Sequence, residues 1–256
     1  MAFIIILSTI STSSSFRANQ PTSFKCAAAV LRLATKYMVT SLRRLAIDHF
    51  SRIIPTRFDA IGTEENYIQV FGDDPPHPFT LVALFRECHL TWFLPWAFYL
   101  ACKEGFDKLV SGDSHNGKGS HMSEEDRRVT LLGWQKLRDV TLEIRRTTVM
   151  SRAPNCKSGA CNNILRMSWL ETAFSRVKSD ALEQWKLFNL LAHYDDRATG
   201  EAQNLRDITP CTICVASWLV MEKQSREKVW NNLPQYFALP LWDVLQEEER
   251  NMRTSE

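Results

Sequence analysis

Residues 30–54 read VLRLATKYMVTSLRRLAIDHFSRII and carry the strongest local pattern in the chain. Apolar side chains recur at helical spacing in the first half, at Val30, Leu33, Ala34 and Tyr37. A second helix is predicted after a cap at Thr40 or Ser41, with an apolar face of Leu42, Leu45, Ala46 and Phe50. It should end near Ile54, because Pro55 disfavours helical dihedrals in the residue before it. Two short amphipathic helices need partners to bury their stripes, so we expect a larger helical assembly.

Composition supports a folded, mostly helical protein. Of the 256 residues, 45% are hydrophobic and 23% charged, as in ordinary globular domains. Nine glycines are few, which favours helices over a turn-rich β architecture, so we predict an all-α fold. The net charge of +2 is too small for nucleic-acid binding to be expected.

The chain outside this stretch can be divided by its Pro, Gly and charge patterns. Pro78 and Pro95 should each open a helix, Ser123 should cap a long one, and Pro210 should precede the last long helix. Another long helix is predicted over 163–188, and 230–245 should wrap the bundle as an extended segment and a final turn. The predicted regions are a disordered or leftover segment (1–25), helices (26–110), a flexible loop (111–122), a helical extension with cysteine pairs (123–245) and a frayed tail (246–256).

Two cysteine pairs form the best candidate site. Cys156 and Cys161 have four residues between them, and Cys211 and Cys214 have two. Cys-x2-Cys is a common half-site for zinc, so a shared structural zinc on all four thiolates is one hypothesis. The 49 residues between the pairs exceed the usual zinc-ribbon spacing. Four reduced thiols, or one disulfide within each pair of a secreted chain, are the alternatives.

The residues give little indication of enzymatic activity. Cys88 precedes His89, but adjacent helical residues point apart. Cys26 and Cys102 stand among apolar residues and are predicted to fill the core. The remaining acid–base or ligand candidates are interpreted as loop residues: His115, His121, His193, Asp195 and Asp196. The sequence contains no glycine-rich phosphate loop or nucleophile elbow, so we predict no catalytic residues and no enzyme.

The N-terminal segment bears on localisation. Residues 2–10, AFIIILSTI, are too few to span a bilayer as a helix. They have the length of a signal-peptide core, but no Lys or Arg precedes Arg17. We therefore expect a cytoplasmic or nuclear protein without membrane contact, and a secreted protein as the alternative.

The phrase LRLATKYMVTSLRRLAIDHF, residues 31–50, resembles the helical end of BTB/POZ domains, particularly the group from mushroom-forming fungi. Phe85-Arg86-Glu87-Cys88 followed by Pro95 is similar to that group's next helices. The closing phrase WNNLPQYFALPLW, residues 230–242, is similar to its final segment. The resemblance covers most of 27–245 and implies cysteines at both pairs.

The resemblance implies the C-terminal helices of a BTB domain followed by a helical extension. BTB proteins commonly self-associate and act as adaptors, including for cullin-type ubiquitin ligases, so the expected function is non-enzymatic protein–protein interaction. Only residues 1–25 precede the resemblance, far fewer than a BTB α/β core needs, and we expect a truncated form. The alternatives are a small secreted helical protein with disulfides, a zinc-stabilised helical module, and a hydrolase with an unrecognised Cys or His site.

Overall fold

The computed structural model describes residues 21–61, 70–71, 76–111, 122–150, 153–158, 161 and 211–254. Within these ranges the regular structure is helical throughout and contains no strand. The prediction of an all-α fold is therefore confirmed for the described part of the chain. Val70 and Phe71, from a stretch with strand propensity, are helical and buried.

The described residues form eight α-helices and two short 3-10 helices. The α-helices are α2 (Phe24–Lys36), α3 (Thr40–Ser51), α5 (Pro78–Glu87), α6 (Leu94–Lys103), α7 (Phe106–Ser111), α8 (Glu124–Met150), α11 (Thr212–Tyr236) and α12 (Trp242–Thr254). The 3-10 helices are η1 (Phe58–Ala60) and η2 (Thr91–Phe93).

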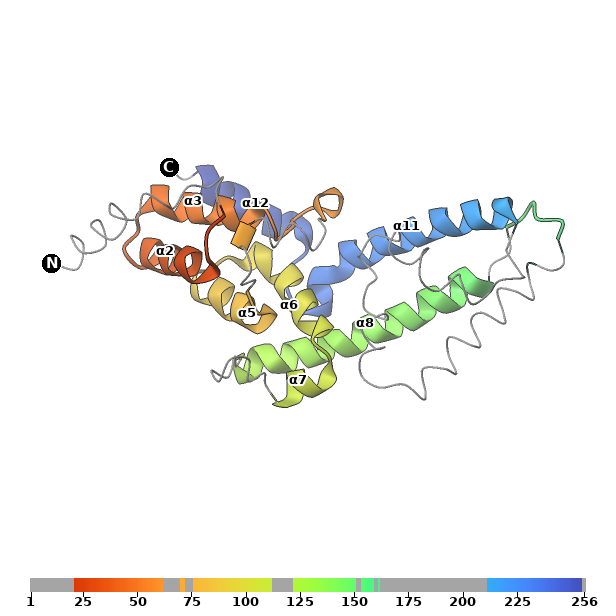
Figure 1. Cartoon of the computed structure of the whole chain (residues 1–256), viewed down its shortest axis with the longest axis horizontal. Coiled ribbons are helices and arrows are strands. Elements are labelled where there is room, and N and C mark those ends of the chain that lie inside the picture. Colours follow the sequence, from red (N-terminus) through yellow and green to blue (C-terminus); the bar gives the residue numbers. More distant parts are fainter. Residues whose placement is uncertain are drawn as a thin grey trace.

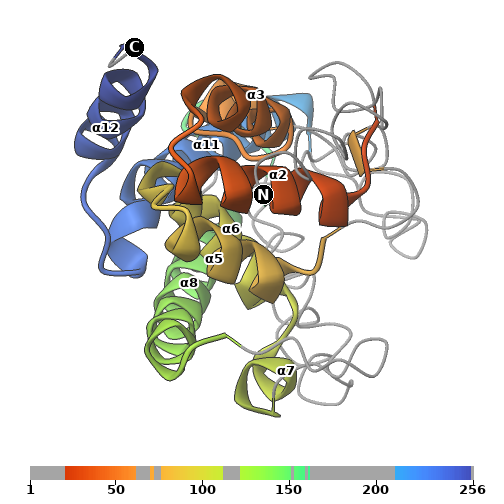
Figure 2. The ribbon, with the colours of Figure 1, turned by 90° about the vertical axis from the view of Figure 1, so that its left-hand side faces the viewer.

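These helices form a body and an arm (Figure 1). The body consists of α2, α3, α5, α6 and α12, with α7 beside the start of α8. The arm consists of α8 and α11, which pack on one another and project from the body. The two helices are antiparallel: α8 runs away from the body and α11 returns to it. Viewed from the body end, α12 lies to one side of α3 and α2, and α8 lies beneath α6 (Figure 2). The antiparallel arm therefore brings the end of α8 and the start of α11 together, far from the body.

Local signals in the sequence start several helices as predicted. Pro78 occupies the first turn of α5, and the backbone N–H of Phe79 donates to His77 Nδ1 at 3.3 Å. Ser123 caps α8, because its Oγ accepts from the N–H of Asp126 at 3.1 Å. These caps satisfy backbone donors that have no partner inside the helix.

The buried stripe of α2 differs from the predicted one. Leu31 is fully buried, whereas Tyr37, at the C-cap, is 40% exposed. In α3 the buried face contains Ile47 and His49, while Leu42 is only partly covered. The helix ends at Ser51, one turn before the predicted boundary. Part of each predicted face is buried, including Ala34 and Phe50, so the prediction of these faces is correct in part.

Aromatic side chains fill the body and extend into the base of the arm. Phe85 contacts Phe50 edge to face, with ring centroids 5.6 Å apart. Phe98 of α6 stacks on Phe237, which follows α11, at 5.2 Å. Such pairs stabilise packing beyond the area they bury. The core is therefore continuous from α2 to the inner end of α11.

The C-terminal segment corrects two predictions. Residues 230–245 are not extended, because α11 continues through Pro234 to Tyr236 and α12 begins at Trp242. Residues 246–254 are helical rather than frayed. Trp242 anchors α12, since its ring stacks on Trp230 at 4.7 Å and its Nε1 donates to the Trp230 carbonyl at 2.6 Å.

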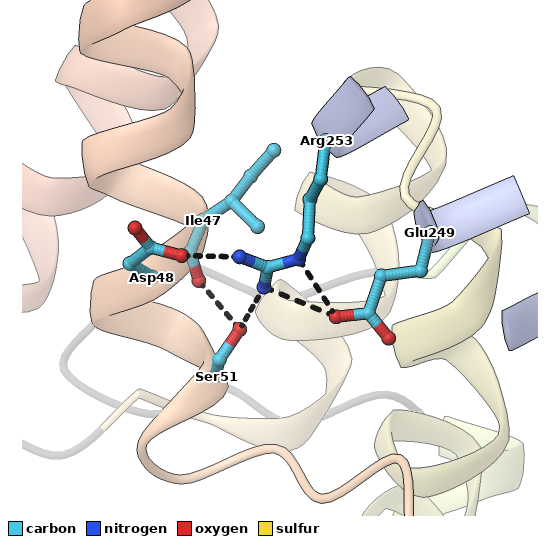
Figure 3. A network of polar contacts seen from close by, with 5 residues as sticks. All are labelled: Ile47, Asp48, Ser51, Glu249 and Arg253. Atoms are coloured by element: carbon cyan, nitrogen blue, oxygen red, sulfur yellow. Dashed lines mark hydrogen bonds and ion pairs between the residues drawn. The ribbon is translucent and has the colours of Figure 1, made fainter. Parts of the chain in front are cut away.

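Arg253 fixes the far end of α12 to α3 (Figure 3). Its guanidinium pairs with Asp48 at 2.6 Å and with Glu249 at 3.0 Å, and it donates to Ser51 Oγ at 3.3 Å. At the other end of the helix, Gln246 donates to the Thr56 carbonyl at 2.8 Å. Residues distant in sequence therefore hold α12 in place. The charged composition of this segment does not by itself indicate that it is a docked helix.

Polar contacts also order the ends of α5 and α6. Glu104 accepts from Lys108 at 2.9 Å and lies 3.7 Å from His77 Nε2. Burial raises the pKa of Glu104, but hydrogen bonds with His77 and Lys108 outweigh it and lower the pKa to about 2. Arg86 pairs with Asp126 at 2.8 Å and links α5 to the start of α8.

The long helix predicted to follow Ser123 is present as α8 and ends at Met150. Leu132 fits the apolar spacing of this helix but is 47% exposed, whereas Trp134 and Leu137 are buried. The predicted helix 163–188 lies outside the described residues, as do residues 112–121 of the predicted loop 111–122, whose first residue, Ser111, is the last residue of α7.

Candidate metal centre

The four predicted site cysteines lie together at the outer end of the arm. Cys156 and Cys161 follow the end of α8, Cys211 is the N-cap of α11, and Cys214 lies in its first turn. Because α8 and α11 are antiparallel, these two chain segments meet. The two cysteine pairs therefore come together because one follows the end of α8 and the other lies at the start of α11. Residues 162–210, which connect the pairs, lie outside the described residues.

The four sulfur atoms have the separations that one metal ion requires. All four Sγ atoms lie within 4.8 Å of one another, and Cys156 Sγ lies 3.6 Å from Cys211 Sγ. Four thiolates bound at 2.3 Å to a tetrahedral zinc would lie about 3.8 Å apart. An iron–sulfur cluster distributes its thiolates over several iron atoms and would space them more widely. The arrangement fits a single tetrahedral ion.

Burial makes this a closed site. Cys156, Cys161 and Cys214 are buried, and Cys211 is partly buried. With Ala153 they form a small core of their own, separate from the main core. Four protein ligands complete a tetrahedral shell and leave no position for a substrate or reactive water. The geometry favours a structural role over catalysis.

Backbone groups around the sulfurs favour negative charge. The N–H of Cys211 donates to Cys161 Sγ at 3.4 Å. The N-terminus of α11, a helix of 25 residues, directs unpaired N–H groups and its positive dipole end toward the cluster. Both effects stabilise thiolates, which are the species that bind metal.

The thiols influence one another's ionisation. Burial raises the pKa of Cys156, but a backbone hydrogen bond at Ser158 and contacts with the other three cysteines lower it to about 6. A backbone hydrogen bond at Ala153 lowers the pKa of Cys214, yet burial and the same sulfur contacts raise it to about 12. One sulfur ionises readily and makes the next harder to ionise, which is the behaviour of a coupled cluster. A cation that binds all four thiolates would relieve that repulsion.

The other cysteines do not form sites. Cys102 is fully buried, its Sγ lies 3.6 Å from the Thr130 carbonyl, and burial raises its thiol pKa well above the usual value. Burial likewise raises the pKa of Cys88, so it lacks the thiolate character of a nucleophile. Cys26 packs against the main core. The histidines and aspartates at 115, 121, 193, 195 and 196 lie outside the described residues.

The described residues also form a depression that the sequence did not indicate. It has a volume of about 520 Å³ and is open to solvent between η1, α11 and α12. Its lining consists of Arg57, Phe58, Asp59, Trp230, Asn231, Trp242 and Gln246. The charges of Arg57 and Asp59 neutralise each other at 2.8 Å, and no motif marks these positions, because the surface is assembled from distant segments.

Comparisons of the chain with protein-family models, with curated proteins and with solved structures give no match. Among the described residues, no helix has the length and apolar character needed to cross a bilayer.

Proposed function

We propose that this protein is a non-enzymatic protein-interaction adaptor of the BTB/POZ type, in which a structural zinc holds the arm together. The observation that carries the proposal is the closed cluster of four cysteine sulfurs, all within 4.8 Å of one another. Closed four-thiolate sites hold structural metal, whereas catalytic zinc sites keep one position open. The chemistry of the site therefore favours a scaffold over an enzyme.

Zinc is the ion that this donor set fits best. Soft thiolate ligands in tetrahedral geometry select zinc or iron, and zinc is the usual ion of structural four-cysteine sites. One ion would join residues 156 and 161 to the first turn of α11, although 49 residues separate the two cysteine pairs in sequence. Binding energy at such a site contributes directly to folding, because the unfolded chain has no preformed site.

The adaptor part of the proposal rests on the BTB resemblance of residues 31–50. The helical pair that this resemblance implies corresponds to α2 and α3, which pack on one another and on α5. The expected partners are a second copy of the chain or a cullin-type ligase component. Exposed Tyr37 and Met38 at the turn between the two helices provide apolar contact surface for a partner.

Light scattering and calorimetry on purified protein test the adaptor role. Size-exclusion chromatography with multi-angle light scattering measures self-association, and titration with the purified N-terminal domain of a cullin measures ligase binding. The proposal predicts a stable dimer, a cullin complex, or both. A monomer that binds no cullin at micromolar concentration would contradict the BTB-type role and leave the metal centre to be judged separately.

A substitution in zinc-loaded protein tests whether the turn between α2 and α3 contacts the partner. Met38→Asp places a charge on a side chain that is 83% exposed, so it should leave the fold intact. If the α2–α3 turn contacts the partner, this variant should weaken the association while retaining the parent's circular dichroism and metal content. Equal association of parent and variant would exclude this turn from the interface.

A further inference from the structure

The four thiols come from two separate segments of the chain, and one close sulfur–sulfur contact crosses between these segments. Cys156 Sγ and Cys211 Sγ are 3.6 Å apart although the residues are 55 positions apart in sequence. A disulfide requires about 2.05 Å between sulfurs, so each needs to move by less than 1 Å once no metal separates them. Neither Cys156 nor Cys211 has to leave the cluster to form that bond.

Solvent access selects the sulfur that reacts first. Cys211 is partly buried, whereas the other three cysteines of the cluster are buried. In the zinc-loaded centre all four sulfurs would be thiolates, so exposure distinguishes them, and an oxidant in solution should reach Cys211 before the others. Cys156 Sγ lies 3.6 Å from Cys211 Sγ, on the other chain segment, so we expect Cys156 rather than Cys214 to be the resolving thiol.

We propose that the centre is an oxidation site at which peroxide exchanges the metal for a disulfide between Cys156 and Cys211. The Cys211 thiolate attacks one peroxide oxygen, the O–O bond breaks, and a sulfenic acid and hydroxide form. The Cys156 thiolate then attacks the Cys211 sulfur and displaces a second hydroxide. Two thiolates and one hydrogen peroxide, with two protons from solvent, give one disulfide and two waters. Zinc leaves because only two thiolates remain to hold it.

The position of this bond determines its consequence. A disulfide within either cysteine pair would not link the end of α8 covalently to the start of α11. A bond from Cys156 to Cys211 instead keeps those segments joined after the ion has gone. Cys161 and Cys214 remain as a dithiol that a second equivalent of peroxide would pair. The arm therefore keeps its outer end closed in reducing and in oxidising surroundings. This inference rests on the proposed function, because it concerns the same four thiolates.

Tryptic mapping of the full chain can distinguish the possible disulfides. Lys157 lies between Cys156 and Cys161, so trypsin places them in separate peptides, 153–157 and 158–166. No Lys or Arg separates Cys211 from Cys214, which share peptide 207–223. Fragmentation between Thr212 and Ile213 then assigns the cross-linked sulfur. Cys26, a partly buried thiol outside the cluster, serves as an internal control that should stay reduced.

The experiment treats zinc-loaded protein with one equivalent of hydrogen peroxide, follows zinc release with a chromophoric chelator, and maps the alkylated digest. We expect release of the ion together with peptide 153–157 linked to 207–223 through Cys211. A link from 153–157 to 158–166, a bond internal to 207–223, or retention of zinc would overturn the inference while leaving the metal centre intact. Protein that contains no zinc before peroxide is added would instead contradict the proposed function.

Discussion

Replacing Gly133 with alanine tests whether α8 and the end of α11 approach each other as closely as the structure indicates. A Cβ atom at this position would lie well inside 3.0 Å of two ring carbons of Phe237, Cδ1 and Cε1. Phe237 is almost fully buried and stacks on Phe98, so its ring cannot move without disturbing the core. Glycine at 133 is therefore needed for packing rather than for backbone conformation.

Two opposing effects determine the size of the change. Alanine improves helix propensity by about 1 kcal/mol over glycine. Overpacking a filled core costs about 1–3 kcal/mol, and displacing an aromatic pair adds about 0.5–1.5 kcal/mol. We expect Gly133→Ala to lower the free energy of unfolding by about 0.5–3.5 kcal/mol, a loss of about 1–14 °C in Tm for a chain of this size.

Urea denaturation of zinc-loaded protein, followed by tryptophan fluorescence, measures this change. Leu132→Ala is the matched control, because Leu132 is an exposed neighbour on the same helix and should change stability little. Combining Gly133→Ala with Phe237→Leu should recover part of the loss, since a smaller side chain makes room for the methyl group. A Gly133→Ala variant as stable as the parent, or more stable, would refute the close contact.

Four further predictions follow from other contacts. Removing zinc with a chelator should increase hydrogen exchange in the outer halves of α8 and α11 while α5 and α6 keep their protection, and uniform protection would contradict the arm's dependence on metal. Met38 has a φ of 53° at the end of α2, so Met38→Gly should raise stability by up to about 1 kcal/mol in thermal unfolding, whereas Met38→Ala should not. Arg253→Met should cost about 1 kcal/mol, with a smaller loss at high salt, and an unchanged midpoint would exclude a role for its pair with Asp48. Because the Glu104 pKa is depressed to about 2, its contribution is present above about pH 5 and lost as pH falls toward 2; Glu104→Gln should flatten that part of the stability–pH curve, and an identical acid limb would disprove it.

Local chemistry made much of the fold predictable. Pro78 and Ser123 start helices through their own backbone constraints and hydrogen bonds, and these act over a few residues. The exposed face of α8 was less predictable: Leu132 has the spacing of a buried residue, but the position of α11 decides which side is covered. The spacing of apolar residues predicts that a helix has a buried face more reliably than it predicts which residues lie on that face.

Long-range contacts explain the remaining differences between the predicted and the observed structure. Residues 246–254 look like a charged tail, yet Trp242 and Arg253 hold them as a helix through partners on α11 and α3. The four cysteines were identified from their pairing and residue type. The spacing alone did not predict that they meet, because that depends on the antiparallel arm, which positions such as Gly133 permit.

Counting zinc and thiols on the same sample tests most directly whether Cys156, Cys161, Cys211 and Cys214 form one metal centre. Elemental analysis of protein purified without chelators gives the metal content, and a thiol reagent applied before and after chelation gives the number of protected cysteines. We predict one zinc per chain and four additional reactive thiols once the ion is removed. A metal-free protein in which chelation leaves the thiol count unchanged would contradict the metal centre.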